Sequence, residues 1–145
     1  MTAYVVDASV VIQRLITDTH SSHVKVLFSG LANSQDELWI PEFCLLECAN
    51  VLWKQVRFSG LPDDQAVQLI QDLVALPLHV TPVSALFSNA LRIGLDHKLA
   101  MYDSVYIAMA SHLGYALITV DTQQEKAAKD VGVVLKNITD FVPTS

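Results

Sequence analysis

The chain has 145 residues, 52% of them hydrophobic, and only two cysteines, which together predict one compact domain over residues 1–145 with a buried core and no disulfide framework. Its 9 Lys and Arg against 15 Asp and Glu residues give a net charge of -6, which argues against broad electrostatic capture of a nucleic-acid backbone. The apolar runs are short and the N-terminus lacks a basic region leading into an apolar stretch, so we expect no membrane span, no signal peptide and a cytoplasmic protein.

The first part of the chain alternates short apolar runs with helical patterns. The predicted elements are a buried strand at 3–6, helices at 8–17 and 20–31, a short strand at 37–40, and a helix that begins near Pro41 and runs to about 58. Pro41 suits the start of that helix because the first helical turn does not need its missing N–H group.

The same alternation continues to the end of the chain. After a break at 60–64, the predicted elements are a helix to Leu76, a strand at 78–83, helices at 84–96 and 102–113, a strand at 116–120, a helix at 122–130 and a last strand at 133–135. Short strands that alternate with helices predict an α/β fold with a mainly parallel sheet of about five short strands.

Four carboxylates interrupt this pattern in apolar surroundings, with no Lys or Arg within four positions of any of them. They are Asp7, Glu47, Asp103 and Asp121. Without them the chain has 11 acids against 9 bases, so the acidity is largely theirs. An isolated charge in an apolar environment is unfavourable unless it is paired or binds a metal. Four such residues predict one acidic site, whose oxygen ligands suit a hard divalent cation.

The predicted fold also indicates where these acids meet. Asp7 and Asp121 each come directly after a strand and before a helix, so both should lie at carboxyl ends of strands. Ligands bind to parallel sheets at these ends, near the point where strand order reverses. If strands 3–6 and 116–120 are neighbours there, the two acids face one crevice.

Each acid also has a simpler structural explanation. Asp7 and Asp103 stand at helix starts, where an Asp often serves as a cap, and Asp121 suits a turn. Glu47 is different, because nothing near it in sequence can pair with it. The four acids together favour a metal site over four unrelated structural roles.

The other polar candidates are weaker. Cys44 and Cys48 share a helix face, but no other cysteine exists, so buried reduced thiols are favoured over a zinc site. Three basic residues are candidates for phosphate contacts, although solvated helix faces are the simpler explanation for each: Arg14, Arg92 and Lys98.

Four segments carry the four acids: VDASV at 6–10, ECANVL at 47–52, YDSVYIAMA at 102–110 and LITVD at 117–121. Together they resemble the PIN-domain nucleases, and among these the VapC-type toxins of toxin–antitoxin pairs. The resemblance extends from Tyr4 to about Phe141. The segments around Asp103 and Asp121, with their spacing, are its most specific part. After Asp121 the match departs from the family pattern, since residues 122–125 (TQQE) lack the apolar residue usual there.

The resemblance implies a three-layer fold, with helices on both faces of the sheet, and a metal-dependent endoribonuclease. It implies one or two Mg²⁺ or Mn²⁺ ions, an RNA substrate, a homodimer and a small antitoxin protein as partner. The catalytic and metal-binding quartet maps to Asp7, Glu47, Asp103 and Asp121. Three neighbouring polar residues are candidates for orienting the ligands or their waters: Ser9, Asn50 and Thr119.

Other function classes share parts of this pattern. A haloacid-dehalogenase-type phosphatase would need a second Asp two residues after Asp7, where this chain has Ser9. A response-regulator receiver would need a Lys after a late strand, and no Lys stands at a suitable place. A non-catalytic binding module of PIN-like fold would keep the partner surface and lose a site acid, whereas all four are present here.

Overall fold

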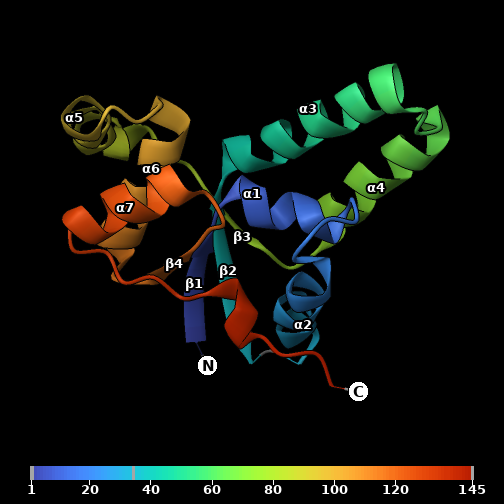
Figure 1. Ribbon diagram of the computed structural model, residues 1–145, viewed down its shortest axis with the longest axis horizontal. Coiled ribbons are helices and arrows are strands. Elements are labelled where there is room, and N and C mark those ends of the chain that lie inside the picture. The colour runs from blue at the N-terminus through green and yellow to red at the C-terminus, as the bar shows by residue number, and fades with distance from the viewer. Residues whose placement is uncertain (1, 34, 145) are drawn as a thin grey trace.

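The centre of the molecule is a four-stranded parallel sheet, seen in a computed structural model that describes residues 2–33 and 35–144 (Figure 1). The strands are β1 (Thr2–Val6), β2 (Asp36–Pro41), β3 (His79–Thr81) and β4 (Ala116–Ile118). Their order across the sheet is β3-β2-β1-β4, and each neighbouring pair is parallel. The predicted α/β class with a parallel sheet is confirmed.

Helices cover the sheet and extend beyond it. The α-helices are α1 (Ala8–Val11), α2 (Ser21–Ala32), α3 (Glu42–Ser59), α4 (Asp63–Ala75), α5 (Phe87–His97), α6 (Met101–Leu113) and α7 (Thr122–Asp130). The 3₁₀-helices are η1 (Ile12–Arg14), η2 (Ser84–Leu86) and η3 (Ile138–Asp140). Figure 1 shows α1 and α2 on one side of the sheet, α5 to α7 on the other, and α3 and α4 projecting as an arm.

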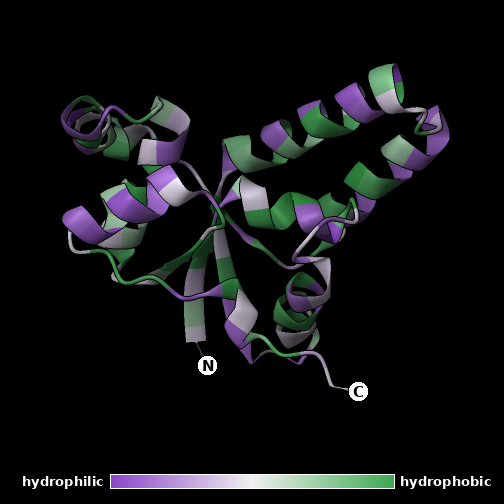
Figure 2. Cartoon of the chain, in the orientation of Figure 1, coloured by the Kyte–Doolittle hydropathy of each residue, from purple (hydrophilic) through white to green (hydrophobic). Residues whose placement is uncertain are grey.

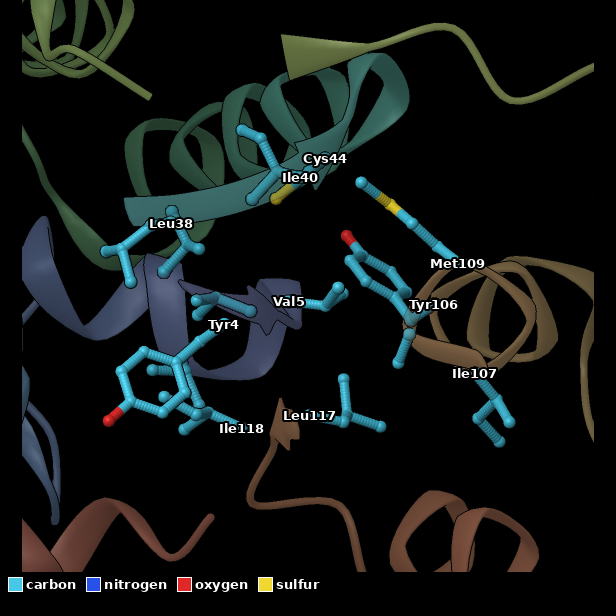
Figure 3. Packing of buried hydrophobic residues seen from close by; sticks show 14 of the residues in the cluster. Tyr4, Val5, Leu38, Ile40, Cys44, Tyr106, Ile107, Met109, Leu117 and Ile118 are labelled. Atoms are coloured by element: carbon cyan, nitrogen blue, oxygen red, sulfur yellow. The ribbon is translucent and has the colours of Figure 1, made fainter. Parts of the chain in front are cut away.

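The core includes residues of α1 and α2 as well as of α6, and α6 is its most deeply buried helix. Residues 104–110 of α6 are all buried, which explains why this helix is apolar around its whole circumference. Tyr106, Ile107 and Met109 lie together beside the buried strand residues Val5 and Leu117 in Figure 3. Gly94 of α5 faces the start of α6, where an added Cβ would lie 2.8 Å from the Leu99 carbonyl oxygen. This close packing fixes the position of the helix that carries Asp103.

Strand order reverses at β1. The chain adds β2 and β3 on one side of β1 and then returns to place β4 on the other side. Val6 pairs with Ile118, and the Asp7 N–H donates to the Ile118 carbonyl at 3.0 Å, so the carboxyl ends of β1 and β4 lie side by side. The expected neighbourhood of these two strands is confirmed, and it defines the switch point of the sheet.

The expected fifth strand at 133–135 is absent, and the sheet has four strands rather than about five. Only Leu135 forms a bridge, to Leu117 of β4. Two hydrogen bonds accompany it, from Leu117 N–H to the Val134 carbonyl at 2.9 Å and from Lys136 N–H to the Leu117 carbonyl at 3.0 Å. The pairing stops there because β4 is three residues long and Asn137 caps η3 immediately afterwards.

The expected helix at 8–17 is also shorter than predicted, because α1 gives way to η1 and then to a loop. The Ser21 hydroxyl donates to the Gln13 carbonyl at 2.9 Å, which offers that carbonyl a partner outside the helix. No helix within residues 2–33 and 35–144 has both the length and the apolar character needed to cross a bilayer.

Candidate functional site

The Asp7 carboxylate is buried at the carboxyl end of β1, with only 4% of the residue exposed. Its Oδ2 caps α1 by accepting from the Ser9 N–H at 3.1 Å, and it also accepts from the Thr119 hydroxyl at 3.3 Å. Its Oδ1 accepts from Gln124 Nε2 at 3.3 Å. Within the described residues no Lys, Arg or His forms an ion pair with it. Among the described residues, only neutral hydrogen-bond donors therefore stabilise the Asp7 carboxylate.

Asp121 lies beside it, just beyond β4. Its Oδ1 accepts from the Gln124 N–H at 2.9 Å and so caps α7, which occupies one of its two oxygens. Two hydroxyls join the strand ends: Thr119 accepts from the Asp121 N–H at 3.1 Å, and Ser9 accepts from the Val120 N–H at 3.3 Å. Asp7 and Asp121 therefore each cap a helix and can still belong to an acidic site.

Glu47 reaches the site from α3 and is partly buried. Tyr106, on α6, donates its phenol proton to Glu47 Oε1 at 2.9 Å. The pKa of Glu47 is raised to about 7, chiefly by burial. The Tyr106 hydrogen bond opposes this rise, and the charges of Asp7 and Asp103 contribute to it. Burial also raises the pKa of Tyr106 well above its usual range, so the phenol keeps the proton that it donates.

Asp103 lies in the first turn of α6 and is partly exposed. Its pKa is raised to about 6, chiefly by burial and in part by the charges of Asp7 and Asp121. The charges of Asp7 and Asp103 thus act on the pKa of Glu47, and the charges of Asp7 and Asp121 act on the pKa of Asp103. The four acids, from four separate elements, are therefore close enough to repel one another.

The donor chemistry of this cluster suits a hard divalent cation. All four groups offer carboxylate oxygens, and the ion pairs among the described residues include none of them. Over residues 2–33 and 35–144, no three His, Cys, Asp or Glu side chains form a ready cage for an ion. Mg²⁺ does not need one, because it usually keeps several waters and uses one or two carboxylates. The residues therefore fit such an ion, with water completing its coordination.

A pocket of about 250 Å³ adjoins Glu47. It is lined by Ala8, Ser9, Ile12, Glu47, Cys48, Asn50 and Val51. Asn50 is exposed and lies on the wall of this pocket, where no hydrogen bond to the four acids is formed among the described residues. Three supporting residues were predicted from sequence. Ser9 and Thr119 form hydrogen bonds with Asp7 and Asp121, and Asn50 lines the pocket beside Glu47.

Two residues of the site do not follow from sequence reasoning. Tyr106 lies one helical turn after Asp103, and its spacing allows a contact on that face but does not indicate Glu47 as its partner. Gln124 lies one turn after Asp121, within the segment 122–125 that departs from the family pattern, and it is completely buried. The departure of residues 122–125 from the family pattern was the available signal.

The remaining candidates lie outside the acidic cluster. Cys44 and Cys48 are free and buried, and a hydrogen bond with Cys48 together with burial raises the pKa of the Cys44 thiol well above its usual range. Both are free thiols of the core, as expected. Arg14, Arg92 and Lys98 are exposed, which agrees with solvated helix faces.

Comparison with known proteins gives concordant matches. The PIN domain family model matches residues 4–130. Ribonuclease VapC3 of Pyrobaculum aerophilum is 29% identical over 121 residues, which cover 82% of this chain and 89% of that protein. The crystal structure of PAE2754 from Pyrobaculum aerophilum superimposes with a TM-score of 0.73 at 22% identity, covering 96% of this chain and 85% of that one.

A further structural neighbour is a protein complex bound to DNA. The structure of VapBC2 from Rickettsia felis, bound to a DNA fragment from the promoter, matches with a TM-score of 0.68 at 15% identity and covers 94% of this chain and 98% of that one. At these identities the two solved structures establish the shared fold. The family match over residues 4–130 shows that the chain belongs to the PIN domain family.

Proposed function

We propose that the protein is a metal-dependent endoribonuclease and the toxin component of a toxin–antitoxin pair, with residues 1–145 forming one nuclease domain. The observation that carries the proposal is the cluster of four carboxylates at the switch point, which has no cationic side chain to neutralise it among the described residues. The family match and the relative named a ribonuclease support the same activity, and family membership removes the phosphatase and receiver alternatives.

The chain supplies both the ligands and a proton-exchanging group. A bound Mg²⁺ or Mn²⁺ ion would neutralise charge on the scissile phosphate and acidify a water that attacks it. Asp7, held by three hydrogen bonds, provides a fixed ligand at the end of β1. Because the pKa of Glu47 is about 7 and Tyr106 occupies Oε1, Oε2 is the atom available to bind or to exchange a proton near neutral pH.

The charge of the protein limits how it can contact an RNA substrate. A net charge of -6 repels a phosphate backbone, so contact with RNA has to be local and to depend on the cation. The pocket beside Glu47 offers Ser9 and Asn50 to a nucleotide next to the scissile bond. RNA cleavage also separates this proposal from a non-catalytic binding module of the same fold.

Removing one site carboxylate should abolish most of the activity. Asp7→Asn, Glu47→Gln and Asp103→Asn should each lower the rate of RNA cleavage in Mg²⁺ or Mn²⁺ by at least about 100-fold while the fold is retained, because each removes a ligand charge. Cleavage is measured on RNA by gel electrophoresis, with circular dichroism as the check on folding.

The matched control is Glu42→Gln, which neutralises an exposed acid on the same helix as Glu47 and should leave the rate unchanged. Wild-type protein that cleaves RNA equally well in EDTA, or a fully active Asp103→Asn variant, contradicts the proposal.

The metal-free protein should lose stability as the pH rises from about 4 to about 7. The pKa of Glu47 is raised from 4.5 to about 7 and that of Asp103 from 3.8 to about 6. A carboxyl with a higher pKa in the folded than in the unfolded state contributes stability that is complete below the unfolded pKa and is lost as pH rises through the folded pKa. At neutral pH, Mn²⁺ should raise the melting temperature because it binds only the folded site.

Asp121→Asn tests the repulsion directly. Asn caps helices about as well as Asp, so this change keeps the hydrogen bond to the Gln124 N–H while it removes one charge. The variant should melt at a higher temperature than wild type in EDTA at pH 7 and should gain less from Mn²⁺, whereas Asp121→Ala also loses the cap. Equal melting of wild type with and without Mn²⁺, combined with a purely destabilising Asp121→Asn, would show that the acids do not act as one site.

The surface offers two apolar regions for partners. Along α5, the exposed residues Phe87, Leu91 and Leu95 are spaced four apart and form a stripe. The arm of α3 and α4, whose apolar residues are visible in Figure 2, exposes Trp53 and Phe58 at its outer end. We assign the α5 stripe to a homodimer and the arm to a small antitoxin protein, because exposed apolar patches of this kind mark protein interfaces.

Leu91→Glu should convert the homodimer to a monomer, since it places a charge in the centre of the α5 stripe. Light scattering at micromolar protein concentration measures the mass. Asn89→Glu, an exposed residue of α5 outside the stripe, serves as control and should remain dimeric. A monomeric wild type, or a Leu91→Glu variant that stays dimeric, rejects this assignment.

A further inference from the structure

Gln124 is a completely buried polar residue in the first turn of α7. Its side-chain nitrogen Nε2 donates to two acceptors, Asp7 Oδ1 at 3.3 Å and the Asp103 carbonyl oxygen at 3.0 Å. Its backbone N–H donates to Asp121 Oδ1 at 2.9 Å. One residue therefore contacts three of the four acidic residues, and it joins the end of β1 to the first turn of α6.

The orientation of the Gln124 amide is fixed by the chemistry of its neighbours. A carboxylate and a backbone carbonyl both accept hydrogen bonds, so only the NH₂ group can face them. The reverse orientation would bring three oxygens together without a donor. In the orientation adopted, both protons of the NH₂ group are used, one for each acceptor.

The other end of the amide argues against a purely structural role. Gln124 Oε1 is buried and has no hydrogen-bond donor among the described residues. Buried polar atoms are almost always hydrogen-bonded, so an unpartnered acceptor is unfavourable. Ala127 and Ala128 of the same helix are buried close by in sequence, and an apolar side chain of similar length would avoid this penalty. The Oε1 atom therefore adds nothing to stability, and what the side chain contributes comes from the two hydrogen bonds of its nitrogen.

We propose that Gln124 is a positioning residue, which holds the Asp7 carboxylate and the α6 turn that carries Asp103 in the geometry that binds the cation. This inference rests on the proposed function and deepens it. Gln124 acts through Asp7 and Asp103, because its nitrogen contacts them directly. The unpartnered Oε1 is the cost of keeping that nitrogen in place.

The test replaces the amide with a side chain of nearly equal length. Gln124→Met should retain the fold, because methionine has nearly the same length and removes the unpartnered acceptor, and its metal-free melting temperature should fall somewhat below that of wild type, because Asp7 Oδ1 and the Asp103 carbonyl lose a donor. Its Mn²⁺ dissociation constant should rise by about 10- to 100-fold, as is typical when a group that orients a metal ligand is lost. Mn²⁺ binding is measured from the electron paramagnetic resonance signal of the free ion, without RNA.

Gln123→Met is the matched control, since it makes the same substitution one residue away on an exposed side chain and should bind Mn²⁺ like wild type. Gln124→Leu provides a second apolar variant if Gln124→Met does not fold. A folded variant whose Mn²⁺ affinity stays within about twofold of wild type overturns the inference alone. A wild-type protein that binds no Mn²⁺ overturns the inference and the proposed function together.

Discussion

The site depends on one buried negative charge that has no cationic partner among the described residues. Asp7 follows directly from the central strand β1, and its carboxylate is held by the Ser9 N–H, the Thr119 hydroxyl and the Gln124 amide. These neutral donors reduce the cost of burying the charge but do not cancel it. The hydrogen bonds fix its position, and the uncompensated charge makes that position a place for a cation.

The negative charges of Glu47 and Asp103 are also unfavourable in the metal-free site. Burial and mutual repulsion raise the pKa of Glu47 to about 7 and that of Asp103 to about 6, so the metal-free site holds its full negative charge only with difficulty at neutral pH. A divalent cation relieves the repulsion and stabilises the ionised carboxylates at the same time. Glu47 and Asp103 lie within helices α3 and α6, and Asp7 and Asp121 are N-cap residues held by hydrogen bonds just beyond β1 and β4.

Much of this arrangement is accessible from the sequence because it follows from local rules. An apolar run followed directly by an acid and a helix predicts a carboxylate at the carboxyl end of a strand, as found for Asp7 and Asp121. The shared crevice needed one further condition, that β1 and β4 are neighbours, and strand order is a long-range property that sequence pattern leaves open. The expected strand at 133–135 was wrong for a similar reason. Its residues have strand-like character, but β4 is only three residues long and pairs with Leu135 alone.

The partners of the acids are harder to predict than the acids themselves. Tyr106 meets Glu47 across 59 positions of sequence, and its role depends on how α3 packs beside α6. In the sequence, Gln124 is an ordinary polar residue of a helical first turn. Only the structure reveals that it is buried and links Asp7 to the Asp103 backbone. Asn50 stays a candidate, because its spacing from Glu47 predicts a supporting role and it lines the same pocket as Glu47.

The central claim is that the four carboxylates form one cation site, and the most direct measurement is an anomalous difference map from a crystal soaked in Mn²⁺. The account predicts a strong anomalous peak at the carboxyl ends of β1 and β4, within coordinating distance of Asp7 and at least one of Glu47, Asp103 and Asp121, with waters as the remaining ligands. No peak at this position, in a crystal where Mn²⁺ is ordered elsewhere on the protein, would contradict it.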